Sequence, residues 1–197
     1  MAEKPNHKAH LTIENLYQIQ RNTNLNSSKH LACWAATCMG FFSFLRSANL
    51  VPKTAGRREP IPALTRSDFY FTERGAVLLV KQTKTHQFED SPLEIPIPRI
   101  PGSPVCPVAA LQALITRAPA DPSKPLFTYE PNKFITYNTL LHYIQSSMEN
   151  IGYNPEDFGC HSTRSGGATL AAELGASPTT SSYMGCGSQM PTSPTSV

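Results

Sequence analysis

Four side chains spread along the chain could together surround one phosphate group. They are two arginines, a lysine and a histidine: Arg46, Lys84, His161 and Arg164. An arginine guanidinium binds phosphate oxygens in bidentate fashion and stays charged at any working pH. A lysine can protonate a leaving oxygen, and a histidine exchanges a proton near neutrality. Because no acidic cluster accompanies them to hold Mg²⁺, the set indicates metal-free phosphoryl transfer at a phosphodiester.

Each of these residues also has an ordinary structural interpretation when it is taken alone. His161 and Arg164 are three positions apart and would share one face of a helix, but such a pair is more often a surface feature. Arg46 could extend its head group from the end of an apolar helix into solvent. Lys84 could protect a sheet edge. The interpretation as a site therefore depends on the whole set and on the elements that carry it.

The apolar pattern predicts those elements. Helices are predicted over 12–21, 29–46, 107–115, 137–151 and 162–174, where apolar residues recur at three- and four-residue steps. Strands are predicted over 64–71, 76–84 and 93–97, separated by turn residues that suit antiparallel hairpins. Arg46 would end the second helix and Lys84 the second strand. Strands set between runs of helices favour an α+β fold, mainly helical with a small three-stranded antiparallel sheet.

Length and composition are those of one folded domain. The chain has 197 residues, of which 40% are hydrophobic, and this excludes a wholly disordered protein. Its net charge is +3, from 17 basic and 14 acidic residues, which permits a nucleic-acid partner without requiring one. We find neither an apolar run long enough to span a membrane nor an N-terminal secretory signal, and we expect no membrane association.

Cofactor and metal motifs are absent from the sequence. The five cysteines are an odd number without CxxC spacing, which argues against a disulfide framework or a zinc cluster. The chain contains no GxGxxG, GxxxxGK[ST], GxSxG or HExxH pattern. We therefore expect no small-molecule cofactor and no bound metal.

The ordered segments resemble the catalytic domain of the tyrosine recombinases (phage integrase family), particularly the DIRS and Crypton types carried by eukaryotic mobile elements. The first catalytic arginine is matched by Arg46 in CMGFFSFLRSANL, and the hairpin lysine by Lys84 in AVLLVKQTKTHQF. The HxxR box is matched by His161 and Arg164 in GCHSTRSGGATLAAELG. The resemblance covers residues 11–176. We expect residues 1–10 to be a flexible N-terminus, and 177–197 to be a disordered tail rich in Ser, Thr and Pro.

This resemblance implies DNA strand exchange or integration through a 3′-phosphotyrosyl intermediate. Arg46 and Arg164 would neutralise the reacting phosphate, a kind of stabilisation whose loss typically costs about 10²–10³ in rate. Lys84 would protonate the leaving 5′-oxygen, and His161 would assist proton transfer or hold the phosphate. The implied partner is DNA, and a homo-oligomer on DNA is allowed. The expected location is the nucleus or, more broadly, the cell interior, since no signal peptide is visible.

Further basic residues are candidates for DNA backbone contacts: Lys53, Arg57, Arg58 and Lys81. Phosphate contacts of this kind supply most non-specific binding and make it depend on salt. An equally good interpretation is a basic loop that faces only solvent.

The sequence departs from the family after its last predicted helix. MGCGSQ carries Cys186 and Gly187 where a histidine or tryptophan is expected, and no tyrosine occurs from Met184 to Val197. Tyr183 precedes this motif and is not assigned as the nucleophile. We therefore expect a truncated or frame-shifted end and a domain that is inactive alone. Alternatives are a tyrosine supplied by another subunit, or a non-enzymatic interaction module on a recombinase-derived scaffold.

Overall fold

The computed structural model describes residues 8–54, 63–81 and 92–176. Its helices are α1 (Ile13–Asn22), α2 (Ser28–Ser43), α3 (Ser47–Leu50), α4 (Pro107–Arg117), α5 (Tyr137–Asn150) and α6 (Cys160–Glu173), with a 3-10 turn η1 (Pro155–Asp157). Its strands are β1 (Phe69–Thr72), β2 (Gly75–Val80), β3 (Leu93–Pro98), β4 (Thr128–Glu130) and β5 (Lys133–Phe134). The predicted fold class is confirmed: the described chain is mainly helical and carries a small three-stranded antiparallel sheet.

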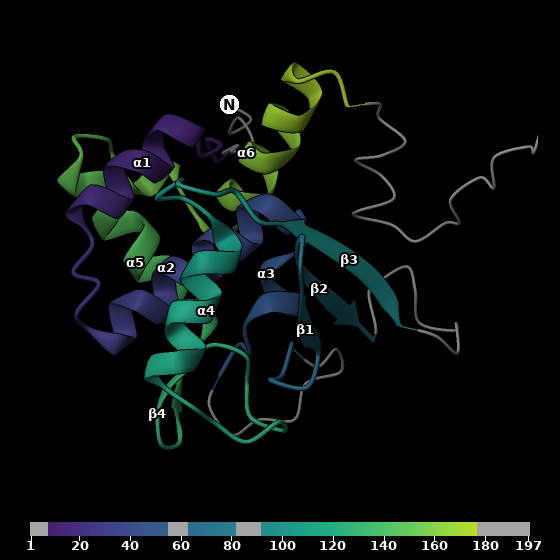
Figure 1. Ribbon diagram of the computed structural model, residues 1–197. Coiled ribbons are helices and arrows are strands. Elements are labelled where there is room, and N and C mark those ends of the chain that lie inside the picture. Colours follow the sequence, from purple (N-terminus) through teal and green to yellow (C-terminus); the bar gives the residue numbers. More distant parts are fainter. Residues whose placement is uncertain (1–7, 55–62, 82–91, 177–197) are drawn as a thin grey trace, which may run out of the picture.

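The buried helix α2 is the centre of the core. Twelve of its sixteen residues are buried, and α4, α5, α6 and the strands β3 and β4 pack against it. Figure 1 shows α1, α4 and α5 on one side of the molecule and the β1–β2–β3 sheet on the other. A helix that is apolar on nearly all sides must be covered by other elements, and α2 is covered in this way. No helix in the described ranges has the length and hydropathy of a membrane span.

The end of α2 differs from the prediction, which continued the helix to Arg46. The helix ends at Ser43 because Phe44 adopts a left-handed backbone conformation, with φ of 54°. The Ser43 hydroxyl donates to the Met39 carbonyl at 2.6 Å and accepts from the Leu45 N–H at 3.3 Å, which satisfies polar groups at the helix end. Arg46 thus lies outside α2, as the residue that begins the short helix α3.

The three-stranded sheet has the order β1–β2–β3, and both pairs are antiparallel, as predicted. The prediction placed the start of the first strand too early. Residues 65–68 form a turn in which the Asp68 carboxylate accepts hydrogen bonds from the Thr65 N–H and hydroxyl, so the strand begins only at Phe69. The predicted second strand, 76–84, is described only as far as Lys81, with Val80 its last strand residue.

Helix α6 approaches α2 closely because glycines line the contact. A Cβ atom on Gly40 would lie 2.9 Å from the Thr163 hydroxyl, and one on Gly166 would lie 1.9 Å from the Leu11 carbonyl oxygen. The Leu11 N–H also donates to the Ser162 carbonyl at 2.9 Å, so the segment before α1 lies along the start of α6. The backbone of α6 is thereby fixed between α2 and the N-terminal segment.

Candidate functional site

Arg46 stands at the junction between α2 and α3. Its backbone is extended, with φ of −68° and ψ of 145°, and its carbonyl accepts the Asn49 N–H at 2.9 Å. The residues on either side, Leu45 and Ser47, are buried, whereas Arg46 itself is half-buried. The guanidinium therefore leaves a rigid backbone that is anchored on both sides, which limits the positions it can reach.

His161 and Arg164 lie in the first turns of α6, as the HxxR spacing predicts. The helix begins after Gly159, whose N–H donates to the Ser162 hydroxyl at 3.0 Å. His161 is exposed and Arg164 is half-buried. Because residues three apart lie on neighbouring positions of a helix surface, the imidazole and the guanidinium extend from one face.

The contact between α2 and α6 brings the Arg46 and Arg164 elements together. A Cβ atom on Gly167 would lie 1.9 Å from the Phe41 carbonyl oxygen and 2.7 Å from the Phe44 ring. Arg46 follows Phe44 by two residues. Arg164 precedes Gly167 by three and, at 3.6 residues per turn, lies on the Gly167 side of α6. The backbone segments that carry Arg46 and Arg164 therefore meet at one tight helix contact.

The other predicted cations are divided between described and undescribed parts of the chain. Lys53 is exposed shortly after α3, and Lys81 is exposed directly after β2. Lys84, Arg57 and Arg58 lie outside the described residues.

Lys81 is held by an acidic residue that the sequence reasoning missed. Its Nζ lies 2.6 Å from Oδ1 of Asp68, whose side chain is buried while that of Lys81 is 58% exposed. Burial alone would raise the pKa of the Asp68 carboxyl, but the contacts with Lys81 and Thr65 outweigh it and lower the pKa below its ordinary value. Asp68 is therefore a charged carboxylate at neutral pH. The sequence signal for it was the T-x-x-D spacing of Thr65 and Asp68, typical of a side-chain-capped turn.

Arg66 is a second buried charged residue that the sequence did not single out. It is 8% exposed, and its Nη2 donates to the carbonyls of Ala118 and Thr128, each at 2.9 Å. Burial lowers the pKa of its guanidinium. Since these carbonyls belong to the end of α4 and the start of β4, Arg66 ties the segment before the sheet to both elements. Its role is structural.

Cys160 is the thiol nearest in sequence to the HxxR pair. It is buried, its Sγ donates to the Tyr137 carbonyl at 3.8 Å, and burial raises its pKa to about 12. A thiol with such a pKa is almost wholly protonated near neutrality and is a poor nucleophile. Across the described ranges, no three His, Cys, Asp or Glu side chains gather in a way that could hold a metal ion. Guanidinium groups, as on Arg46 and Arg164, and an imidazole, as on His161, are side chains of a kind that can bind an anion.

Comparison with known proteins shows which known structure the fold resembles. No protein-family model and no curated protein sequence matches the chain. Among solved structures, it resembles the XerH site-specific recombinase bound to its difH substrate in a pre-cleavage complex, with a TM-score of 0.63 and 16% sequence identity. The match covers 91% of this chain and 47% of that one, so the chain spans about half the length of its structural neighbour. The fold is thus similar to a tyrosine-recombinase core.

Proposed function

We propose that this chain is a DNA-binding domain of the tyrosine-recombinase type, belonging to a system for DNA strand exchange or integration. The observation that carries the proposal is the close contact of α2 with α6, because Arg46 follows α2 and Arg164 lies in α6. Similarity of the fold to a site-specific recombinase supports the same assignment.

In this proposal the two arginines bind one backbone phosphate. Guanidinium groups are suited to the task because each can give two parallel hydrogen bonds to phosphate oxygens. His161, exposed on the same face of α6 as Arg164, would donate a further hydrogen bond or exchange a proton. Lys84 is proposed to protonate the leaving 5′-oxygen.

The proposed contacts outside the central phosphate come from four basic residues: Lys53, Arg57, Arg58 and Lys81. Each neutralised phosphate should steepen the log–log dependence of affinity on salt by about 0.9 on duplex DNA. The slope of the salt dependence therefore gives the number of phosphate contacts, and single substitutions show which residues make them.

We further propose that these 197 residues, assayed alone, bind DNA without forming a phosphotyrosyl bond. The reason is the sequence from Met184 to Val197, which contains no tyrosine. The motifs around Arg46 and the HxxR pair motivate the finer proposals of a DIRS- or Crypton-type mobile element, a nuclear location, and several copies assembled on DNA.

Two measurements on the same protein test this proposal. The first is a titration of labelled duplex DNA between about 50 and 200 mM salt, where binding should weaken steeply. The second is incubation with a nicked suicide duplex, followed by denaturing electrophoresis. We expect binding without a covalent band. A denaturation-resistant adduct would overturn the proposed inactivity, and absence of binding at low salt would favour a non-enzymatic interaction module.

A further inference from the structure

Asp68 is a buried carboxylate with two distinct sets of contacts. Its Oδ2 accepts the Thr65 N–H at 2.8 Å and the Thr65 hydroxyl at 2.7 Å, both within its own turn. Its Oδ1 faces the Lys81 Nζ at 2.6 Å. The side chains differ sharply in exposure, with 6% for Asp68 and 58% for Lys81. The carboxylate is therefore fixed in the protein, whereas the ammonium group at its outer side reaches solvent.

The backbone fixes this arrangement from both ends. The Asp68 carbonyl accepts the Leu79 N–H at 2.8 Å, which ties the turn before β1 to the end of β2. Lys81 follows β2 directly, after the pairing of Val80 with Leu93. The carboxylate and the root of the lysine side chain thus keep a constant separation, and only the flexible lysine stem can change its partner.

From this geometry we propose that Asp68 competes with a DNA backbone phosphate for the Lys81 ammonium group and so sets the strength of DNA binding. The inference rests on the proposed DNA-binding function and adds a regulatory residue to it. Lys81 would leave Oδ1 for a phosphate oxygen, while Oδ2 keeps its two hydrogen bonds from Thr65. No proton is transferred, and one ion pair is exchanged for another.

A competing role and a positioning role for Asp68 predict opposite effects on DNA affinity when the residue is neutralised. If Asp68 holds Lys81 away from DNA, neutralisation of Asp68 must strengthen DNA binding, because the ammonium group no longer has to be separated from a buried anion. If Asp68 instead aims Lys81 at the phosphate, its neutralisation must weaken binding. Asparagine suits the test since its side-chain oxygen can still accept the Thr65 N–H and hydroxyl, which preserves the turn.

The experiment is a double-mutant cycle with wild type, Asp68→Asn, Lys81→Gln and the double variant, each titrated with the same labelled duplex DNA across a salt series. We expect Asp68→Asn to bind the duplex several-fold more tightly than wild type, because Lys81 no longer has to leave a buried carboxylate to reach the phosphate. Lys81→Gln should bind more weakly. In the Lys81→Gln background, Asp68→Asn should add only the small gain due to the change in net charge.

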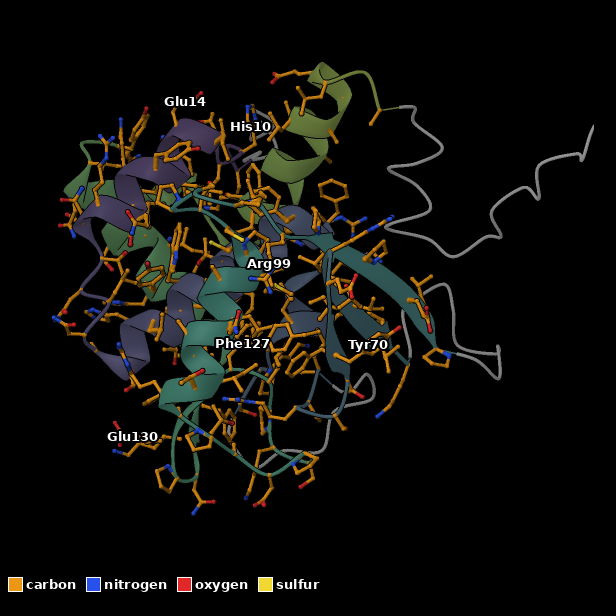
Figure 2. The ribbon with its side chains drawn as sticks, in the orientation of Figure 1. His10, Glu14, Tyr70, Arg99, Phe127 and Glu130 are labelled. Carbon is orange, nitrogen blue, oxygen red and sulfur yellow. The ribbon has the colours of Figure 1, made fainter. Side chains whose placement is uncertain are left out.

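A matched control measures that net-charge gain. Glu130 and Lys133 form an ion pair of the same 2.6 Å length on the β4–β5 hairpin. Figure 2 shows Glu130 at the hairpin, well apart from Tyr70 on the sheet. Glu130→Gln also removes one negative charge and releases one lysine, so its effect on affinity is subtracted from that of Asp68→Asn.

The outcomes separate this inference from the function on which it rests. If wild type and every variant fail to bind DNA at low salt, the proposed function fails. If wild type binds but Asp68→Asn binds no better than Glu130→Gln, or worse than wild type, competition is refuted. If Asp68→Asn does not fold, NMR of the wild type tests the proposal. Addition of DNA at neutral pH must shift the signal of the Asp68 carboxyl carbon, and an unmoved signal refutes the proposal.

Discussion

Gly167 of α6 lies so close to Phe41 of α2 that a Cβ atom on the glycine would stand 1.9 Å from the Phe41 carbonyl oxygen. That distance leaves no room for a side chain, so the two helix backbones touch. Arg164 lies one turn before this contact, and Arg46 follows α2 shortly after it. The approach of the two backbone segments that carry these arginines therefore depends on the absence of a side chain at position 167.

Gly167→Ala should consequently destabilise the protein, although alanine is the better helix former by about 1 kcal/mol. Overpacking against a backbone oxygen typically costs up to about 3 kcal/mol, and for a domain of this size each kcal/mol lowers Tm by about 2–4 °C. Calorimetry should show a lower Tm. Ser165→Ala, on the exposed side of the same helix, is the control and should change Tm little. An unchanged or higher Tm for Gly167→Ala would show that the helices are not in backbone contact.

Replacement of Arg66 should also destabilise the fold. Arg66→Met removes the donor for the Ala118 and Thr128 carbonyls and leaves them buried, at a typical cost of about 1–3 kcal/mol for each unsatisfied group. Chemical denaturation measures the loss. Arg74→Met removes an exposed arginine from the β1–β2 turn and should be nearly neutral. Equal stability of the two variants would contradict a tying role for Arg66.

The contribution of Asp68 to stability should depend on pH in a defined direction. Its pKa is lowered in the fold, so the stabilisation is present above the ordinary pKa of 3.8 and is lost as the pH falls through the lower folded value. The difference in unfolding free energy between wild type and Asp68→Asn should thus be largest near neutral pH and shrink in acid. Urea unfolding at several pH values gives this difference. A constant difference down to the acid limit would mean that the charge of Asp68 does not stabilise the fold.

The four described cysteines should resist alkylation in the native protein. Cys33, Cys38, Cys106 and Cys160 are free and buried. Burial raises the pKa of Cys33 and of Cys160 to about 12 and also raises that of Cys38. At pH 8 a thiol with such a pKa is ionised in only about one molecule in ten thousand. Mass spectrometry after iodoacetamide treatment should find these four unmodified until urea is added, and rapid native labelling of any of them would contradict their burial.

Local sequence signals were sufficient for much of the fold. The helices predicted from residues 12 and 137 agree with the starts of α1 and α5, where the Thr12 and Thr136 hydroxyls accept the N–H groups of Asn15 and Thr139. Arg164 falls within the helix predicted over 162–174, whereas His161 lies in α6 because that helix begins at Cys160, two residues earlier than predicted. These features depend on residues within one helical turn, and such short-range chemistry is readable from sequence.

Features that depend on distant segments could not be predicted. The left-handed conformation of Phe44 ends α2 early, yet phenylalanine carries no turn signal. Arg66 falls within a predicted strand, and only the packing of α4 and β4 around it makes it buried. The β4–β5 hairpin went unpredicted because its strands are very short, although Pro131 and Asn132 marked the turn and Asn132 has φ of 60°.

The central claim is that Arg46 and Arg164 bind a DNA phosphate, and the salt dependence of DNA affinity tests it most directly. Wild type, Arg46→Ala, Arg164→Ala and Lys29→Ala are titrated with one duplex across a salt series. Lys29 lies at the opposite end of α2, about 21 Å of helix away from Ser43 at the Arg46 end, and controls for the loss of one charge. Each arginine variant should bind more weakly, with a log–log slope reduced by about 0.9, while Lys29→Ala keeps the wild-type slope. Arginine variants that match Lys29→Ala in affinity and slope would contradict the account.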